Sequence, residues 1–373
     1  MQTTTLKTEE GGLPAQMRKH SYDMIVFCHL RWDFVYQRPQ HIISRMAKKY
    51  KILFIEEPWR RQTEKQSRLL RIHENLHVLQ PNVETIEDII RIVPDYVDNT
   101  TVEIGWFYSP SFVPLLTCFD FSTIVYDCMD ELSLFKGAPA ELIEHERYLV
   151  ANADVVFTGG KSLYETKARL HSNVHCYPSS VDQAHFEKAL NGIALPDDIA
   201  TIPAPIVGYF GVIDERLDLA LLQDIAKLRP DVSFVMIGPL AKIEAHELPV
   251  APNIHYLGMK DYEQLPNYIK AFDLAMMPFA LNDATKFISP TKTLEYMAAH
   301  KPIASTAIKD VVRDYSHCVS VIHNVDDFDK AIADATDEIP DPFLNYEYKL
   351  ILQKTSWDST VLSMMEQIKA IAQ

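Results

Sequence analysis

A stretch near the C-terminal end of the chain combines an anion-binding pattern with one carboxylate. Its sequence is SPTKTLEYMAAHKPIAST, from Ser289 to Thr306. Ser289 suits the position before a helix, and Pro290 suits the first helical position. The backbone amides of Thr291 and Lys292 would then point out of the helix start. With the Lys292 ammonium, these amides predict a cradle for a diphosphate.

Glu295 lies three residues after Lys292, on the same face of the expected helix. A carboxylate beside a phosphate site is useful if it accepts hydrogen bonds from the two hydroxyl groups of a ribose. Our hypothesis is therefore that Glu295 binds a nucleotide ribose. The alternative is a surface ion pair between Lys292 and Glu295.

The loop after the first apolar run, HLRWDFVYQRPQH, gathers polar side chains. Arg31, Gln37, Arg38 and His41 lie there, at the carboxyl end of an expected strand. Open α/β sheets bind ligands at that edge, and we take Arg38 as a candidate for stabilising negative charge. The alternative is a solvated loop in which Pro39 starts a helix.

The second half of the chain contains a similar loop in GYFGVIDERLDLALL. Gly211 would let a ligand approach the backbone closely, and Arg216 would fork onto a diphosphate. An ion pair of Arg216 with Asp214 or Asp218 is an equally good interpretation.

The segment YDCMDE supplies two candidates for catalysis, Asp127 and Asp130. Both fall at the carboxyl end of an expected strand. An ionised aspartate that reaches a substrate hydroxyl can position it or remove its proton. The alternative is that one of them caps the following turn.

These residues need a framework, and the hydrophobic pattern indicates one. From Tyr22 onward, short runs rich in Val, Ile and Phe alternate with amphipathic segments of helix length, which is typical of doubly wound parallel sheets. The alternation pauses in FEKALNGIALPDDIATIPAP, where three prolines suggest a connector, and restarts with PIVGYFG. The sequence predicts an α/β protein with two doubly wound domains that face a cleft.

Composition excludes several classes of protein. The formal charge of −15 argues against nucleic acid as a partner. Five cysteines without a Cys-x-x-Cys pair fit a reduced protein better than a disulfide framework or a zinc site. No apolar run resembles a signal peptide or a membrane span, so we expect a cytoplasmic protein.

The order of these motifs resembles the GT-B glycosyltransferases, specifically the family 4-like enzymes of the group 1 type that use nucleotide sugars. The likeness extends from Tyr22 onward and includes QRPQH, YDCMDE, GYFG and SPTKTLEYMAAHKPIAST. By resemblance, the fold is GT-B with two Rossmann-like domains, Glu295 binds the nucleotide ribose, and the helix start from Ser289 to Lys292 holds the diphosphate.

The resemblance also implies the activity and the domains. We expect a retaining, metal-independent transfer from a nucleoside diphosphate sugar, a co-substrate rather than a cofactor, to a saccharide or lipid-linked saccharide in polysaccharide or glycolipid biosynthesis. The expected segments are a disordered tail at 1–20, an acceptor domain at 21–190, a linker at 191–204, a nucleotide-sugar domain at 205–355 and a helix at 356–373 that packs back on the first domain.

Two departures from the family concern the donor sugar. Family 4 enzymes commonly carry a second glutamate eight positions before the one that binds ribose, and Phe287 stands there. ERLD replaces a common lysine-glycine pair. The alternatives to a transferase are a GT-B sugar-nucleotide epimerase and a non-catalytic nucleotide-sugar binding protein.

A locally basic stretch, WRRQTEKQSRLLR from Trp59 to Arg71, contrasts with the acidic whole. It favours either an exposed helix or a peripheral contact with an anionic membrane at the inner face of the plasma membrane.

Overall fold

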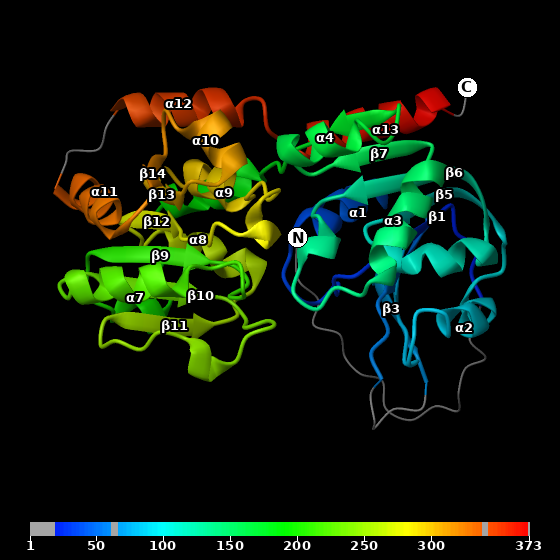
Figure 1. The fold of residues 1–373 in the computed structure, drawn as a ribbon, viewed down its shortest axis with the longest axis horizontal. Helices are drawn as coiled ribbons and strands as arrows, with labels where there is room; N and C mark the ends of the chain where they lie inside the picture. Colours follow the sequence, from blue (N-terminus) through cyan, green and yellow to red (C-terminus); the bar gives the residue numbers. More distant parts are fainter. Residues whose placement is uncertain (1–18, 61–65, 338–341, 372–373) are drawn as a thin grey trace.

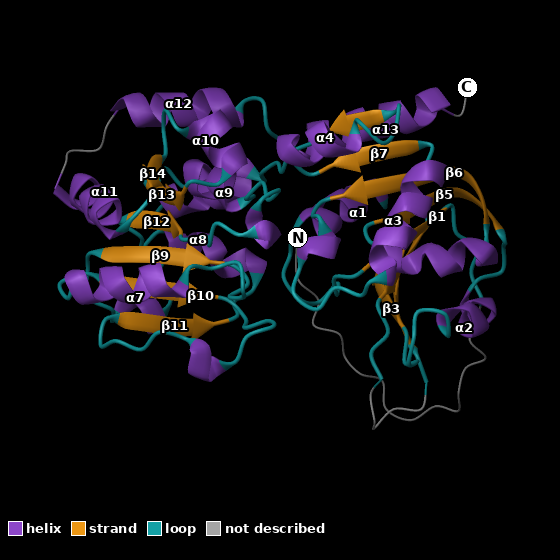
Figure 2. Ribbon diagram, viewed as in Figure 1, coloured by secondary structure: helices purple, strands orange, loops and turns teal. Residues whose placement is uncertain are grey.

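The computed structural model describes residues 19–60, 66–337 and 342–371 of the chain. Most of the expected tail at 1–20 therefore lies outside the described residues. Two open sheets, each with its own helices, form the two halves of the molecule (Figure 1). Strands and helices alternate in both halves (Figure 2), as the hydrophobic pattern predicts.

The first sheet has eight strands, and all of its pairings are parallel except the one between β3 and β4. Across the sheet the order is β3 (Arg68–His73), β4 (Leu76–Gln80), β2 (Ile52–Glu56), β1 (Met24–Cys28), β5 (Thr101–Phe107), β6 (Asp120–Cys128), β7 (Val155–Thr158) and β8 (Val174–Cys176). Its helical segments are α1 (Arg38–Met46), α2 (Ile89–Tyr96), η1 (Pro110–Cys118), η2 (Leu132–Leu134), α3 (Glu141–Asn152) and α4 (Lys161–Lys167).

Both faces of this sheet are covered, which explains why β1 is entirely apolar. Ile25 and Phe27 pack into one hydrophobic cluster, whereas Met24 and Val26 pack into another on the opposite face. Alternation between two cores is the expected behaviour of a central strand in a parallel sheet.

The second sheet has six strands, all parallel. Their order is β11 (Ile254–Gly258), β10 (Ser233–Ile237), β9 (Ile206–Phe210), β12 (Leu274–Met277), β13 (Ile303–Thr306) and β14 (Ser320–Ile322). Its helical segments are α7 (Leu219–Leu228), η4 (Ala245–Glu247), η5 (Tyr262–Gln264), α8 (Leu265–Ile269), η6 (Asp283–Thr285), α9 (Lys292–Ala298), α10 (Lys309–Tyr315), α11 (Val325–Asp337) and α12 (Pro342–Leu352).

The connection between the sheets is helical rather than irregular. It contains α5 (Gln183–Phe186), η3 (Glu187–Leu190) and α6 (Asp197–Ala200). Phe186, Ala189 and Ile199 are buried in the core of the second sheet. The first domain's own packing therefore ends before residue 190, because the apolar side chains of this segment belong to the second core.

The final helix, α13 (Trp357–Ile371), crosses back to the first domain, where it lies at the top of the molecule in Figure 1. Trp357 stacks on His41 of α1, with 4.7 Å between the ring centroids. Val361, Met364 and Ile368 join the same cluster as β1. The chain thus crosses between the domains twice.

The described part of the basic stretch from Trp59 to Arg71 contains no helix, because Arg68 to Arg71 belong to β3 at the edge of the sheet. Residues 61–65 lie outside the described residues. Trp59 is 54% exposed. Among the described residues, no helix combines the length and the apolar character needed to cross a membrane.

Candidate active site

Two adjoining cavities lie between the domains, at the carboxyl ends of both sheets. The narrow cavity has a volume of about 100 Å³ and the wide cavity about 380 Å³. Both contain Gln37, Met129 and Asp130 from the first domain and Arg216 from the second. The arrangement suits two ligands that meet at their shared wall.

The narrow cavity is built largely from the segment with the anion-binding pattern. Ser289, Pro290, Thr291 and Lys292 line it, opposite Arg38 of the first domain. In the described part of the chain, no residue accepts a hydrogen bond from the amides of Thr291 and Lys292. These amides are therefore available to an anion.

The start of the helix differs from the prediction. Helix α9 begins at Lys292 and is preceded by Thr291, so Ser289 is not its N-cap. The carbonyl of Ser289 and the hydroxyl of Thr291 instead form hydrogen bonds with Ser179 of the first domain, at 3.3 and 2.9 Å. These polar groups fix the segment to the opposite domain.

Lys292 is held against a backbone that has no room for a side chain. A Cβ atom at Gly211 would lie 2.2 Å from Lys292 Cε, and Gly211 has a φ of 139° that L residues rarely adopt. The Lys292 ammonium lies 5.5 Å from the centre of the Tyr209 ring. Gly211 therefore serves the site by admitting Lys292, although it does not itself line the narrow cavity.

Glu295 is buried, with 6% of its surface exposed. It makes no ion pair with Lys292 or with any other described residue, which disfavours the surface ion pair. Burial raises the pKa of Glu295 to about 7, and the Lys292 charge opposes this rise. Burial likewise lowers the pKa of Lys292 to about 8, against the attraction of Glu295. A buried carboxylate without a hydrogen-bond donor is costly unless a ligand supplies one.

Arg216 forms an ion pair with Asp214, one of the two alternatives that the sequence allowed. Its guanidinium donates from Nε and Nη2 to both carboxylate oxygens of Asp214, at 2.7 to 3.1 Å. Asp218 instead accepts a hydrogen bond from the amide of Leu221 at the start of α7. Arg216 still lines both cavities, so a diphosphate would meet it as a paired cation.

Arg38 and Asp127 form a buried pair rather than two separate catalytic groups. The Arg38 Nη2 atom lies 2.8 Å from Asp127 Oδ1, and Arg38 Nη1 donates to the carbonyl of Tyr177 at 2.7 Å. Asp127 is fully buried and lines neither cavity. Its geometry favours a positioning role, because Arg38 occupies the carboxylate that a hydroxyl would need.

The other loop residues flagged in the sequence have structural contacts. The guanidinium of Arg31 pairs with Glu56 at 3.0 Å. Gln37 precedes α1, and its backbone N–H donates to the side-chain oxygen of Gln40 at 3.1 Å. His41 packs under Trp357. Of this loop, Gln37 and Arg38 line the narrow cavity and Arg31 and His41 do not.

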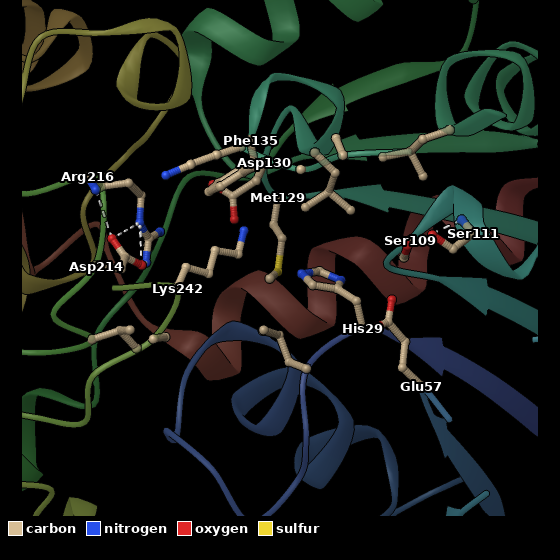
Figure 3. A pocket seen from close by; sticks show the side chains of 18 of the residues that line it. His29, Glu57, Ser109, Ser111, Met129, Asp130, Phe135, Asp214, Arg216 and Lys242 are labelled. Atoms are coloured by element: carbon tan, nitrogen blue, oxygen red, sulfur yellow. Dashed lines mark hydrogen bonds and ion pairs between the residues drawn. The ribbon is translucent and has the colours of Figure 1, made fainter. Parts of the chain in front are cut away.

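Asp130 is the carboxylate best placed for chemistry, because it lines both cavities. Figure 3 shows it at the wide cavity. It is half-buried, and no described residue donates a hydrogen bond to its carboxylate. Burial raises its pKa, and the positive charge of Arg216 opposes the rise.

Three polar residues of the wide cavity escaped the sequence interpretation: His29, Glu57 and Lys242 (Figure 3). Burial and the Lys242 ammonium lower the pKa of His29 to about 4, so this ring is neutral at pH 7. Its buried Nδ1 atom has no hydrogen-bond partner among the residues that the structure describes. Burial raises the pKa of Glu57 to about 7. His29 and Glu57 follow strands β1 and β2 directly, and this position at the strand ends could have identified them from the sequence.

Lys242 comes from the second domain and reaches across the wide cavity. Its backbone is left-handed, with a φ of 60°, which is uncommon outside glycine. The ammonium lies 4.6 Å from the centre of the Phe135 ring and 3.8 Å from Glu215. Phe135 follows η2 of the first domain, so Lys242 closes the cavity from the opposite side.

Phe287, where the family commonly has a glutamate, packs against the hydrophobic cluster of the first domain. Phe287 therefore makes an apolar contact between the domains. Asp327 and Asp329, which flank Phe328 in a short acidic segment, lie in α11, and Asp327 accepts a hydrogen bond from the backbone amide of His323 at 2.9 Å. Among the described residues, no group of three or more His, Cys, Asp or Glu side chains is arranged to hold a metal ion.

Comparisons with known proteins agree with this geometry. Residues 204–339 match the family described as glycosyl transferases group 1. A Bacillus subtilis (strain 168) protein named as a candidate teichuronic acid biosynthesis glycosyltransferase, TuaH, is 24% identical over 217 residues. That match spans 54% of this chain and 54% of the relative, so the chain covers about half the length of the curated protein.

Solved structures with the same fold cover almost the whole chain. The trehalose-phosphate synthase (UDP-forming) of Burkholderia vietnamiensis has a TM-score of 0.67 at 11% identity, with 95% of this chain and 98% of that one covered. HepE of Anabaena, in complex with UDP and glucose, has a TM-score of 0.65 at 12% identity, with 93% and 99% covered. The predicted GT-B fold is confirmed by these structures. The match over residues 204–339 and the Bacillus subtilis relative support the predicted group 1 glycosyltransferase class.

Proposed function

We propose that the chain transfers a sugar from a nucleoside diphosphate sugar to an acceptor hydroxyl, with retention at the anomeric carbon. The observation that carries the proposal is that no described residue forms a hydrogen bond or ion pair with the Lys292 ammonium or with the buried Glu295 carboxylate. Lys292 and the amides of Thr291 and Lys292 lie at the narrow cavity, and Glu295 follows on the same helix, although it does not itself line the cavity. The diphosphate would occupy this cavity, and the ribose hydroxyls would satisfy Glu295.

The wide cavity suits the acceptor, because Asp130 separates it from the narrow cavity. Neutral His29 and the carboxylates of Asp130 and Glu57 accept hydrogen bonds from hydroxyl groups, whereas Leu132, Phe135 and Leu142 offer an apolar wall. These groups fit a saccharide acceptor, free or lipid-linked. Teichuronic acid biosynthesis in the name of the relative supports a role in polysaccharide biosynthesis.

The positive charges at the narrow cavity support metal independence. Lys292 supplies a cation with no ion-pair partner among the described residues, and Arg38 and Arg216 add hydrogen-bond donors at the same cavity. Preorganised donors of this kind stabilise the negative charge that develops on a leaving phosphate. Transfer should therefore persist in the presence of EDTA.

A thermal-shift screen with nucleoside diphosphates and their sugars tests the proposal. A ligand present at a hundred times its Kd stabilises the folded state by about 2.7 kcal/mol. UDP and UDP-glucose are the first probes, because structural neighbours were solved with UDP. A screen in which no nucleoside diphosphate raises the Tm would contradict the proposal. Turnover of the bound sugar nucleotide, with and without an acceptor, separates a transferase from an epimerase or a non-catalytic binder.

Replacement of Glu295 by alanine should weaken binding of the nucleotide sugar by about tenfold to a hundredfold, because hydrogen bonds to a charged group contribute roughly 1.5 to 3 kcal/mol. The fold should persist, since the change removes a buried carboxylate that no described residue compensates. Isothermal titration calorimetry measures the loss. The exposed Glu263 provides a control, and equal affinity of wild type and Glu295→Ala would exclude the ribose role.

We also propose a weak peripheral contact between the stretch from Trp59 to Arg71 and anionic membranes. The protein should sediment with anionic vesicles at low salt and dissociate toward physiological ionic strength, where the Debye length is about 8 Å. Arg68 and Arg71 are exposed on the edge strand β3, so the double change Arg68→Glu, Arg71→Glu should abolish the effect. No sedimentation of the wild type at low salt would contradict this prediction.

A further inference from the structure

A buried carboxylate outside both cavities joins the two domains. Asp310, in the first turn of α10, is 3% exposed. It accepts hydrogen bonds from the amide and the hydroxyl of Ser162, at 3.3 and 2.5 Å, and from Arg313 of its own helix. Ser162 belongs to the first turn of α4 in the other domain, so this contact depends on how the domains are placed.

Gly160, the residue before α4, lies close to Asp310 and leaves no room for a side chain between them. A Cβ atom at Gly160 would lie 2.8 Å from Asp310 Oδ2 and 2.9 Å from the Cβ atom of Ser289. Gly160 also has no side chain with which to bind the first amides of α4. Asp310 therefore binds an amide of α4 from the other domain, and only glycine leaves the space to do so.

The surrounding ion pairs are exposed and contribute less. Glu165 of α4 accepts hydrogen bonds from Lys309 and Arg313 of α10, but it is 47% exposed. Lys161 pairs with Asp314 in a similar position, where Lys161 is 45% exposed. Exposed pairs of this kind contribute little to stability, because solvent screens them. Asp310 is the member of this interface whose energy rises most if Ser162 moves away, because its buried carboxylate would then lack these hydrogen bonds.

The contact lies next to the narrow cavity. Gly159 and Ser179 line that cavity from the first domain, whereas Ser289 and Lys292 line it from the second. A side chain at Gly160 would meet Ser289 as well as Asp310. The separation between these two walls is therefore set at the place where Asp310 binds α4.

We propose that Asp310 is a positioning residue for the donor: it holds Gly160 and the first turn of α4 against Ser289, so that the first domain closes the wall of the narrow cavity beside Lys292. The role in donor binding rests on the proposed function, whereas the role in holding the domains together does not.

The first experiment uses the full chain without substrate. In Asp310→Ala, peptides that cover 161–167 should exchange amide hydrogen about tenfold faster or more, because the bond to a charged acceptor is lost. Double electron–electron resonance between spin labels on the two domains should show a broader distribution of distances in this variant than in the wild type. Lys309→Ala, which removes only an exposed pair, should match the wild type in both measurements. Unchanged exchange and distances in Asp310→Ala would overturn the proposal.

The second experiment changes Gly160 in the first domain, so it remains informative if Asp310→Ala fails to fold. Gly160→Ala should also broaden the distances, because its methyl group would meet Asp310 and Ser289. Gly192→Ala is the matched control, since a Cβ atom there meets nothing within 4 Å. If Gly160→Ala has the wild-type distances, the proposed tight contact is wrong.

Titration with UDP connects the contact to the donor. Asp310→Ala and Gly160→Ala should bind UDP about tenfold more weakly than the wild type, whereas Asp310→Asn should lose less, since its amide oxygen still accepts from Ser162. Wild-type affinity in both variants would overturn the donor role. Failure of the wild type to bind any nucleoside diphosphate would instead overturn the proposed function and leave the exchange and distance results intact.

Discussion

Replacement of Lys292 by methionine should reduce kcat/KM for sugar transfer by about a hundredfold to a thousandfold, the usual effect of removing one donor to a developing oxyanion. Methionine keeps the length and apolar contacts of the side chain over Gly211, so the change removes mainly the charge. The ammonium is unpaired in the described structure, and the arginines at the same cavity already share their charge with Asp127 and Asp214. They should compensate poorly for its loss.

The pH dependence of donor binding gives an independent check on Lys292. Burial lowers its pKa to about 8, so the free protein loses this charge as the pH rises through that value. A diphosphate binds the protonated form more tightly. The affinity of the wild type for UDP should therefore fall as the pH rises above about 8, and the slope should approach about a tenfold loss per pH unit. In Lys292→Met that fall should vanish.

Lys286→Met is the control, because Lys286 is exposed in the same loop and does not line the narrow cavity. It should retain both the turnover and the pH profile of the wild type. If Lys286→Met and Lys292→Met lose activity equally, the effect comes from the general positive charge of the loop rather than from a specific contact.

The sequence was sufficient for the framework and for one side of the site. Apolar strands and amphipathic helices alternate strongly, and central strands such as β1 and β9, each with five buried residues, can be identified by composition alone. The segment from Ser289 to Glu295 was recognisable because Pro, Lys and Glu occur there at fixed spacing. Its helix nevertheless starts two residues later than the Ser-Pro pattern predicts, because Ser289 and Thr291 form hydrogen bonds with Ser179 of the other domain.

Residues that depend on contacts between the domains could not be predicted in this way. Lys242 follows β10 in an unremarkable loop, and its role arises from a left-handed backbone that brings it over Phe135, more than a hundred residues earlier in the chain. Asp127 had the residue type and the strand-end position expected of a catalytic base. Its pairing with Arg38 is a tertiary contact that no local pattern encodes.

The stereochemistry of transfer makes Asp130 the most informative residue of the shared wall. If the reaction inverts the anomeric carbon, a base must take the acceptor proton in the transition state, and Asp130→Asn should lower kcat by about a hundredfold to ten-thousandfold. If it retains the configuration by attack from the face of the leaving group, the departing phosphate takes that proton. The same substitution should then mainly raise the KM for the acceptor.

We expect retention, because the family resemblance predicts it and because Lys292 and the free amides hold the leaving phosphate at the narrow cavity, next to Asp130. Burial raises the pKa of Asp130 above its ordinary value, but the opposing charges of Arg216 and Lys242 favour the ionised form that binds a hydroxyl. Proton NMR of the new glycosidic linkage decides between the mechanisms. An anomeric configuration opposite to that of the donor, together with a collapsed kcat in Asp130→Asn, would make Asp130 an inverting base; a retained configuration with a raised acceptor KM would make it a binding group for the acceptor.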